Sequence, residues 1–146
     1  MLTLDVYRAR MTLNPSSKPR ILLADDHPAL LAETASLLQR DHEVVGTATN
    51  GLELLDQAER LHPNVIVLDI SMPVMGGFEA ARRLKQSGCR SKLVFLTVSE
   101  DADFAREALA LGAEAYVVKS RLASDLVGAI SDALVERKFV SPTIEL

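Results

Sequence analysis

Five short runs of apolar, mostly β-branched residues recur along the chain, and longer segments with helical spacing separate them. The runs are residues 21–25, 43–49, 65–69, 92–97 and 115–119. This interleaving is typical of strands joined by crossover helices, which is the pattern of a parallel sheet. The sequence therefore predicts an α/β protein with a doubly wound, five-stranded parallel sheet and helices on both faces.

Helical periodicity covers the segments between and after these runs. The expected helices are residues 28–40, 51–60, 77–86, 101–110 and 122–137. Gly88 and Gly112 follow two of them, at a position where a left-handed residue is cheap only for glycine. The last helix has apolar residues at spacings of four, namely Leu122, Leu126, Ile130 and Leu134. Such a stripe is expected to lie on the sheet.

Length and composition restrict the class of protein. A chain of 146 residues suits one domain, and residues 1–18, which end near the turn-forming stretch "NPSSKP", are expected to be a tail and linker. No apolar run approaches the roughly 20 residues that a bilayer helix needs, so we expect no membrane span. The formal charge of −4 shows no general electrostatic footprint for nucleic acid.

The single cysteine and the N-terminus bear on the compartment. Cys89 has no second cysteine with which to form an internal disulfide. Asp5 stands in the N-terminal region, where a signal peptide would have a basic end followed by a long apolar stretch. We therefore expect a reducing, cytoplasmic location.

Chemically competent side chains follow four of the five expected strands. Asp25 and Asp26 follow the first strand, Asp69 the third, Thr97 the fourth and Lys119 the fifth. Each of them alone could cap a helix or be solvated. In a doubly wound sheet, however, the carboxyl ends of the strands meet at one edge, and ligands bind there. Their joint occurrence predicts a site at this edge.

The three acids at this edge predict a metal ion. Carboxylates crowded together repel each other unless a cation offsets them, and ligands that are all oxygen favour a hard ion such as Mg²⁺. Because Mg²⁺ keeps several waters, it would leave open positions for a phosphoryl group.

Four stretches occur in an order that resembles a known family. "LLADDHP", "VLDISMPVMGG", "FLTVSE" and "AYVVKS" together resemble the receiver domains of two-component response regulators. The resemblance implies a flavodoxin-like strand order 2-1-3-4-5, a receiver domain over residues 19–138, and a linker remnant over residues 139–146. "ADDHP" and Ser120, which replaces a common proline after Lys119, are similar to receivers attached to LuxR-type helix-turn-helix domains.

The resemblance implies a role for each acid. Asp69 would be the phosphoacceptor, attacking the phosphorus of a phosphohistidine on a sensor histidine kinase. Asp26 and the backbone carbonyl of Ser71 would coordinate Mg²⁺ (or Mn²⁺) together with Asp69. Asp25 would hold the ion mainly through water.

The resemblance also implies a switch. Lys119 would contact the phosphoryl oxygens, and the hydroxyl of Thr97 would turn toward one of them. Tyr116, three residues before the lysine, would move inward when Thr97 engages the phosphoryl group, changing an output surface. In receivers, the positions of Ser71 and Ser99 tune the access of the hydrolytic water. Because both residues are small and uncharged here, the resemblance implies a moderate or long phosphoryl lifetime.

Four neighbours of these residues are interpreted as loop positions. Pro73 is expected to stiffen the loop after Asp69, while Gly76 and Gly77 permit backbone angles that are forbidden to other residues. His27 is interpreted as a polar residue before Pro28 and not as a metal ligand.

The family resemblance implies signalling and not catalytic turnover. The output would be transcription control through a DNA-binding domain that this chain lacks, with a phosphorylation-dependent homodimer and DNA contact only through that domain. Two alternatives stay open: a phosphohydrolase of the haloacid-dehalogenase kind, although Ser71 stands where a second acid is needed, and a degenerate receiver used only for interaction. The sequence also leaves open whether the chain is a piece of a longer regulator or a stand-alone receiver.

Overall fold

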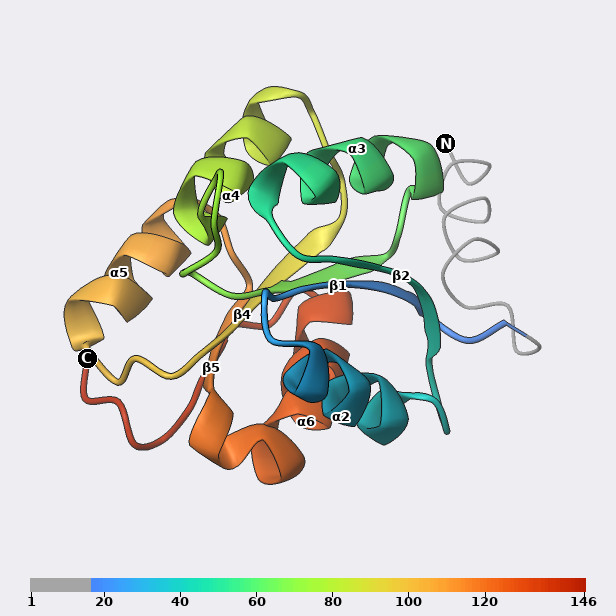
Figure 1. The fold of residues 1–146 in the computed structure, drawn as a ribbon. Coiled ribbons are helices and arrows are strands. Elements are labelled where there is room, and N and C mark those ends of the chain that lie inside the picture. The colour runs from blue at the N-terminus through green and yellow to red at the C-terminus, as the bar shows by residue number, and fades with distance from the viewer. Residues whose placement is uncertain (1–16) are drawn as a thin grey trace, which may run out of the picture.

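A parallel sheet lies at the centre of the computed structural model, which describes residues 17–146 (Figure 1). Within these residues the sheet has six strands, in the order β2-β1-β3-β4-β5-β6, and all neighbouring strands are parallel. The strands are β1 (Arg20–Ala24), β2 (Glu43–Ala48), β3 (Val65–Leu68), β4 (Lys92–Thr97), β5 (Ala115–Val118) and β6 (Phe139–Val140). The tail predicted over residues 1–18 lies almost entirely outside the described residues.

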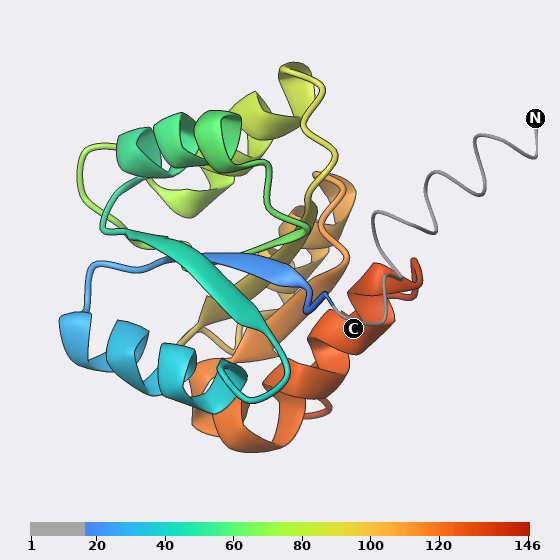
Figure 2. The same ribbon diagram turned by 90° about the vertical axis from the view of Figure 1, so that its right-hand side faces the viewer.

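Helices cover both faces of the sheet (Figure 2). On one face lie α2 (Pro28–Leu38) and α6 (Leu122–Leu134), and on the other lie α3 (Gly51–Leu61), α4 (Gly77–Gln86) and α5 (Ala102–Ala110). A short 3₁₀ turn, η1 (Lys119–Arg121), joins β5 to α6. The predicted doubly wound α/β fold is therefore confirmed.

Alternate residues of each central strand face opposite helical layers. Ile21 and Leu23 of β1 belong to the core under α2 and α6, whereas Leu22 belongs to the core under α3, α4 and α5. All four residues of β3 are buried. Because both faces are covered, these strands are continuous apolar runs without polar alternation. The stripe predicted for the last helix also packs on the sheet, through Leu126 and Ile130.

The predicted number of strands was wrong, because the end of the chain adds a sixth. Phe139 and Val140, expected to lie in a linker remnant, pair in parallel with Ala115 and Tyr116 of β5. Ser141 has no exposed surface, and Ile144 is 7% exposed. A strand of two residues has no periodicity to detect, which explains why it was missed. The domain boundary itself stays a prediction.

Two helices are shorter than predicted. α2 ends at Leu38 and α6 ends at Leu134. Glu136, just past α6, has a φ of 62°, which no right-handed helix can include. The expected extension of the last helix to residue 137 was therefore wrong.

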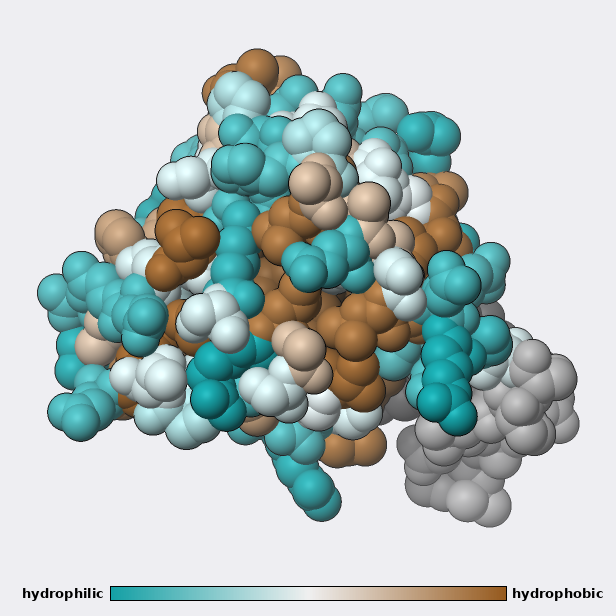
Figure 3. All heavy atoms as spheres, turned by 60° about the horizontal axis from the view of Figure 1, so that its bottom comes forward, coloured by the Kyte–Doolittle hydropathy of each residue, from teal (hydrophilic) through white to brown (hydrophobic). Residues whose placement is uncertain are grey.

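The outer face formed by α2 and α6 has an apolar centre bordered by hydrophilic residues (Figure 3). Leu30, Leu31 and Leu37 of α2 are only partly buried, and Val127 of α6 is 37% exposed. Within residues 17–146, no helix has the length and apolar character needed to cross a membrane.

Candidate functional site

Two acids stand side by side where neighbouring central strands end. The β1–β3 pairing runs up to Ala24 and Leu68. One residue further, the amide of Asp69 donates a 3.0 Å hydrogen bond to the Ala24 carbonyl, and the amide of Asp25 donates to Ala48 of β2 at 3.0 Å. Each acid is only 4% exposed. The sheet therefore fixes the backbone of both residues and buries their side chains.

Lys119 reaches both acids from the end of β5. Its Nζ lies 2.7 Å from Oδ2 of Asp25 and donates a 3.0 Å hydrogen bond to Oδ2 of Asp69. Burial alone would lower the pKa of Lys119, but the two carboxylates outweigh it and raise the pKa above its usual value. The ammonium is thus kept charged and shared between the acids.

The cluster has more negative than positive charge. Asp26 is more exposed and adds a third carboxylate, while Lys119 is the only lysine or arginine paired with these acids in the described part of the chain. One ligand atom from each of Asp25, Asp26, His27 and Asp69 lies within 4.8 Å of the others. Oδ2 of Asp25 is buried, and its only polar partner within residues 17–146 is the Lys119 ammonium at 2.7 Å. Buried carboxylate oxygens with spare capacity fit a hard divalent cation such as Mg²⁺.

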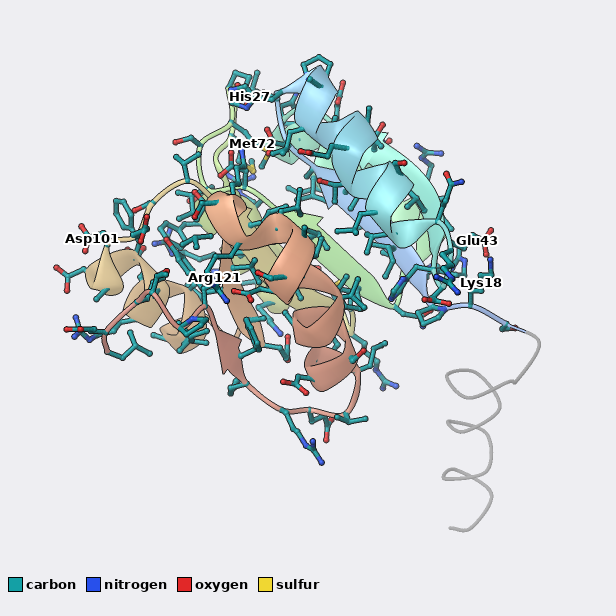
Figure 4. All side chains as sticks on the ribbon, turned by 90° about the horizontal axis from the view of Figure 1, so that it is seen from below. Lys18, His27, Glu43, Met72, Asp101 and Arg121 are labelled. Carbon is teal, nitrogen blue, oxygen red and sulfur yellow. The ribbon has the colours of Figure 1, made fainter. Side chains whose placement is uncertain are left out.

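His27 belongs to this cluster, which the sequence analysis did not predict. Its ring Nδ1 lies 2.8 Å from Asp25 Oδ1 and 3.1 Å from Asp26 Oδ1. The pKa of His27 is raised, first by the hydrogen bond to Asp25 and then by the charge of Asp26. The cluster lies at the His27 and Met72 end of the sheet, opposite Lys18 and Glu43 (Figure 4). The sequence signal for this membership of the cluster was the position of His27, which directly follows two acids and precedes the first turn of a helix.

Close packing explains why glycine stands at position 77. A Cβ atom there would lie 2.0 Å from the backbone oxygen of Asp69, and the Gly77 amide donates a 2.7 Å hydrogen bond to Ile70. Neither Gly76 nor Gly77 uses the backbone angles that only glycine permits, since Gly76 has an extended conformation with φ −78° and Gly77 begins α4. The start of α4 instead packs closely against the backbone of Asp69 and Ile70, just after β3.

The left-handed residue of this loop is Val74, with a φ of 68°. The amide of Met75 donates a 2.7 Å hydrogen bond to Pro73, closing a three-residue turn around Val74. Positive φ is strained for a β-branched residue. The Met75 carbonyl also accepts from Gly51 at the start of α3. Ser71, the predicted carbonyl ligand, lies exposed in the same loop.

The two predicted switch residues lie on β4 and β5. Thr97 ends β4, is 3% exposed and pairs with Val118. Tyr116 is fully buried, and its hydroxyl donates a 2.9 Å hydrogen bond to the carbonyl of Ser99. Burial raises the pKa of Tyr116. The ring is therefore inside the protein in this structure.

These features define a doubly wound α/β domain with an acidic, lysine-bridged site at the carboxyl edge of its sheet. The family model described as the response regulator receiver domain matches residues 21–131. The chain belongs to this family, whose members are domains of two-component signalling.

Relatives of known sequence agree with this assignment. The chain is 35% identical over 127 residues to the uncharacterized transcriptional regulatory protein YvfU of Bacillus subtilis (strain 168), covering 86% of this chain and 64% of the relative. It is 34% identical over 126 residues to the nitrate/nitrite response regulator NarL of Escherichia coli (strain K12), covering 85% of this chain and 58% of NarL. The chain thus spans less than two thirds of the length of these relatives.

Solved structures confirm the fold. A LuxR-family two-component response regulator from Aurantimonas sp. SI85-9A1 matches with a TM-score of 0.83 at 33% identity, covering 88% of this chain and 93% of that one. The receiver domain of the putative regulator NarL from Mycobacterium tuberculosis matches with a TM-score of 0.79 at 25% identity, covering 83% of this chain and 99% of that one. The predicted likeness to LuxR-type receivers is confirmed.

Proposed function

We propose that this receiver accepts a phosphoryl group from a sensor histidine kinase on Asp69, in a reaction that needs Mg²⁺ or Mn²⁺. One observation carries the proposal: the buried carboxylate of Asp69 lies 3.0 Å from the ammonium of Lys119, beside two further acids. A free carboxylate repels an incoming phosphoryl group, and the ammonium offsets this repulsion.

The transfer conserves atoms and electrons. An oxygen of Asp69 attacks the phosphorus, the bond between phosphorus and the histidine nitrogen breaks, and its electron pair stays on that nitrogen. The product is an acyl phosphate on Asp69. The divalent ion, held by Asp26, Asp69 and the Ser71 carbonyl, with Asp25 acting through water, would stabilise charge on the phosphoryl oxygens. Lys119 would leave Asp25 and pair with the new phosphoryl group.

The signal would pass from Asp69 to the far side of β4 and β5. Phosphorylation adds close to two negative charges. Thr97 would turn its hydroxyl toward the phosphoryl group, and the space thus opened would hold Tyr116 in the buried position that it has in this structure. Its hydrogen bond to Ser99, within the β4–α5 loop, links the tyrosine to the surface that would change.

The output we propose is transcription control through a DNA-binding domain outside this chain. The names of its relatives, which include transcriptional regulators of greater length, support this. We propose a cytoplasmic location for the protein. We also propose a phosphorylation-dependent homodimer, because α2 and α6 expose an apolar surface (Figure 3) that a second copy could cover. RcsB, whose 23% identity concerns the fold alone, has been seen as dimers bound to DNA.

Labelling by acetyl phosphate tests the proposal directly. The wild-type chain with Mg²⁺ should gain one phosphoryl group in intact-mass measurements and then elute earlier in size-exclusion chromatography. Asp69→Asn should show neither change, while Asp103→Asn, at an exposed aspartate of α5, should behave as the wild type. Undiminished labelling of Asp69→Asn would overturn the assignment of the acceptor.

A further inference from the structure

A second buried polar cluster lies at the corner where β5 leads into α6. Its centre is Asp125, which is 6% exposed, and Ser141, which has no exposed surface. Ser141 belongs to the C-terminal segment, residues 139–144, that follows β5 and α6 in the chain. The phosphorylation chemistry proposed above uses neither residue.

Ser141 is hydrogen-bonded on three sides. Its Oγ accepts from the amide of Val118 at 3.1 Å and donates to Oδ2 of Asp125 at 2.8 Å. Its own amide donates to the carbonyl of Tyr116 at 2.9 Å. Ser141 thus connects two backbone positions of β5, those of Tyr116 and Val118, with the first turn of α6.

Asp125 is held equally well. Arg121 donates to it from Nε at 2.7 Å and from Nη2 at 3.1 Å, and Ser124 donates at 3.2 Å. Burial would raise the pKa of Asp125, but the hydrogen bonds from Arg121 and Ser141 outweigh this and lower the pKa. The carboxylate is therefore a charged, fixed anchor.

The backbone of Lys119 lies between residues that are held by Ser141 and by Asp125. Val118 precedes it, Arg121 closes the η1 turn behind it, and Ser141 holds both ends through Val118 and Asp125. We propose that Ser141 is a positioning residue for Lys119: it fixes the turn that aims the ammonium at Asp69. This inference rests on the proposed role of Asp69 as phosphoacceptor.

Loss of the Ser141 hydroxyl has a distinctive expected effect. The amide of Val118 loses its acceptor, the turn loosens, and Lys119 spends less time at the acids. The ammonium and a divalent cation compete for the same carboxylates, so a mis-aimed Lys119 should strengthen Mg²⁺ binding while slowing phosphoryl transfer. General damage to the site would instead weaken both.

The test compares Ser141→Ala with two matched controls. Thr143→Ala removes an exposed hydroxyl from the same segment, and Ser124→Ala removes a donor to Asp125 that does not touch Val118. For Ser141→Ala we expect a labelling rate with acetyl phosphate about three- to tenfold lower and a Mg²⁺ dissociation constant about twofold lower, since small free-energy changes move rates and affinities by such factors. In metal-free protein, the amide of Val118 should exchange at least about tenfold faster with solvent. Both controls should match the wild type.

The outcomes are decisive. The inference would be overturned if Ser141→Ala kept wild-type labelling and wild-type Mg²⁺ affinity, or if both were weakened. The proposed function would still stand in that case, provided that the wild type is labelled and Asp69→Asn is not. If Asp69→Asn were labelled, the proposed function itself would fail. Should circular dichroism show that Ser141→Ala does not fold, Arg121→Gln acts on the same turn from its part-exposed end. It must show the same opposed changes, at smaller size, for the inference to stand.

Discussion

Two polar clusters in the described part of the chain, one around the buried Asp25 and Asp69 and one around the buried Asp125, are built differently. In the corner cluster, one carboxylate faces one guanidinium, and each oxygen of Asp125 accepts two hydrogen bonds. In the site cluster, one ammonium pairs with Asp25 and Asp69, Asp26 adds a third carboxylate, and the only polar partner of Asp25 Oδ2 among the described residues is that ammonium. The corner cluster is complete, whereas the site cluster has negative charge left over.

This difference separates structure from function. Buried polar groups in folded proteins are normally satisfied, and one that is not needs an explanation. A cluster that only holds the fold gains from full internal pairing, but such pairing leaves nothing to attract a ligand. Excess negative charge at the site costs stability in the free protein and becomes favourable when a divalent cation arrives.

Breaking the complete cluster should have the largest effect on stability. Asp125→Ala leaves the Ser141 hydroxyl without its acceptor and frees Arg121, so we expect a loss of about 2–4 kcal/mol in the free energy of unfolding. Urea denaturation with an unchanged slope measures it. The control Glu59→Ala, at an exposed position of α3, should stay within about 0.5 kcal/mol. A loss as small for Asp125→Ala would remove the contrast between the clusters.

Removing a charge from the incomplete cluster should act in the opposite direction. Asp25→Asn keeps an oxygen that can accept from the His27 amide but reduces the repulsion with Asp69. We expect the metal-free protein to gain about 1 kcal/mol of stability, while Mg²⁺ binds at least about tenfold more weakly. Thermal unfolding with and without Mg²⁺ measures both quantities. A variant destabilised in the absence of metal would show that Asp25 is mainly a structural residue.

Most of the fold, and the residues at the centre of the site, could be predicted from the sequence because they depend on local patterns. The apolar runs are long enough to show their period, and the geometry of a parallel sheet then brings residues 25, 69 and 119 together. Asp25, Asp69 and Lys119 do meet in the structure.

The features that were missed depend on contacts between distant residues or on backbone detail. Ser141 meets Val118 across 23 residues, and β6 has only two residues, so neither has a sequence period. The strained conformation falls on Val74, a residue type that gives no turn signal, while the glycines nearby serve close packing. These are cases in which tertiary contacts decide what local preference cannot.

Acidification should weaken the corner cluster through protonation of Asp125. The pKa of Asp125 is lower in the folded protein than its ordinary value of about 3.9, so its stabilising contribution is present above about pH 4 and is lost as the pH falls through the folded pKa. The stability gap between the wild type and Asp125→Asn should therefore be constant above about pH 5 and shrink in more acidic solution. Urea midpoints over this range measure the gap. A gap that widens on acidification would contradict the complete pairing of the corner cluster.

The smallest expected effect concerns His27, which partly offsets the excess charge of the site. Its pKa is raised in the free protein, so protonated His27 stabilises the fold fully below about pH 6.5, and this contribution is lost as the pH rises through the folded pKa. Mg²⁺ at the same carboxylates should lower that pKa, and by reciprocity acidification through it should weaken Mg²⁺ binding about two- to threefold. NMR titration of the His27 ring with and without Mg²⁺ measures both. In His27→Asn the affinity for Mg²⁺ should lose this dependence on pH; if it persists unchanged, the titrating group is elsewhere and the ring does not share the charge of the site.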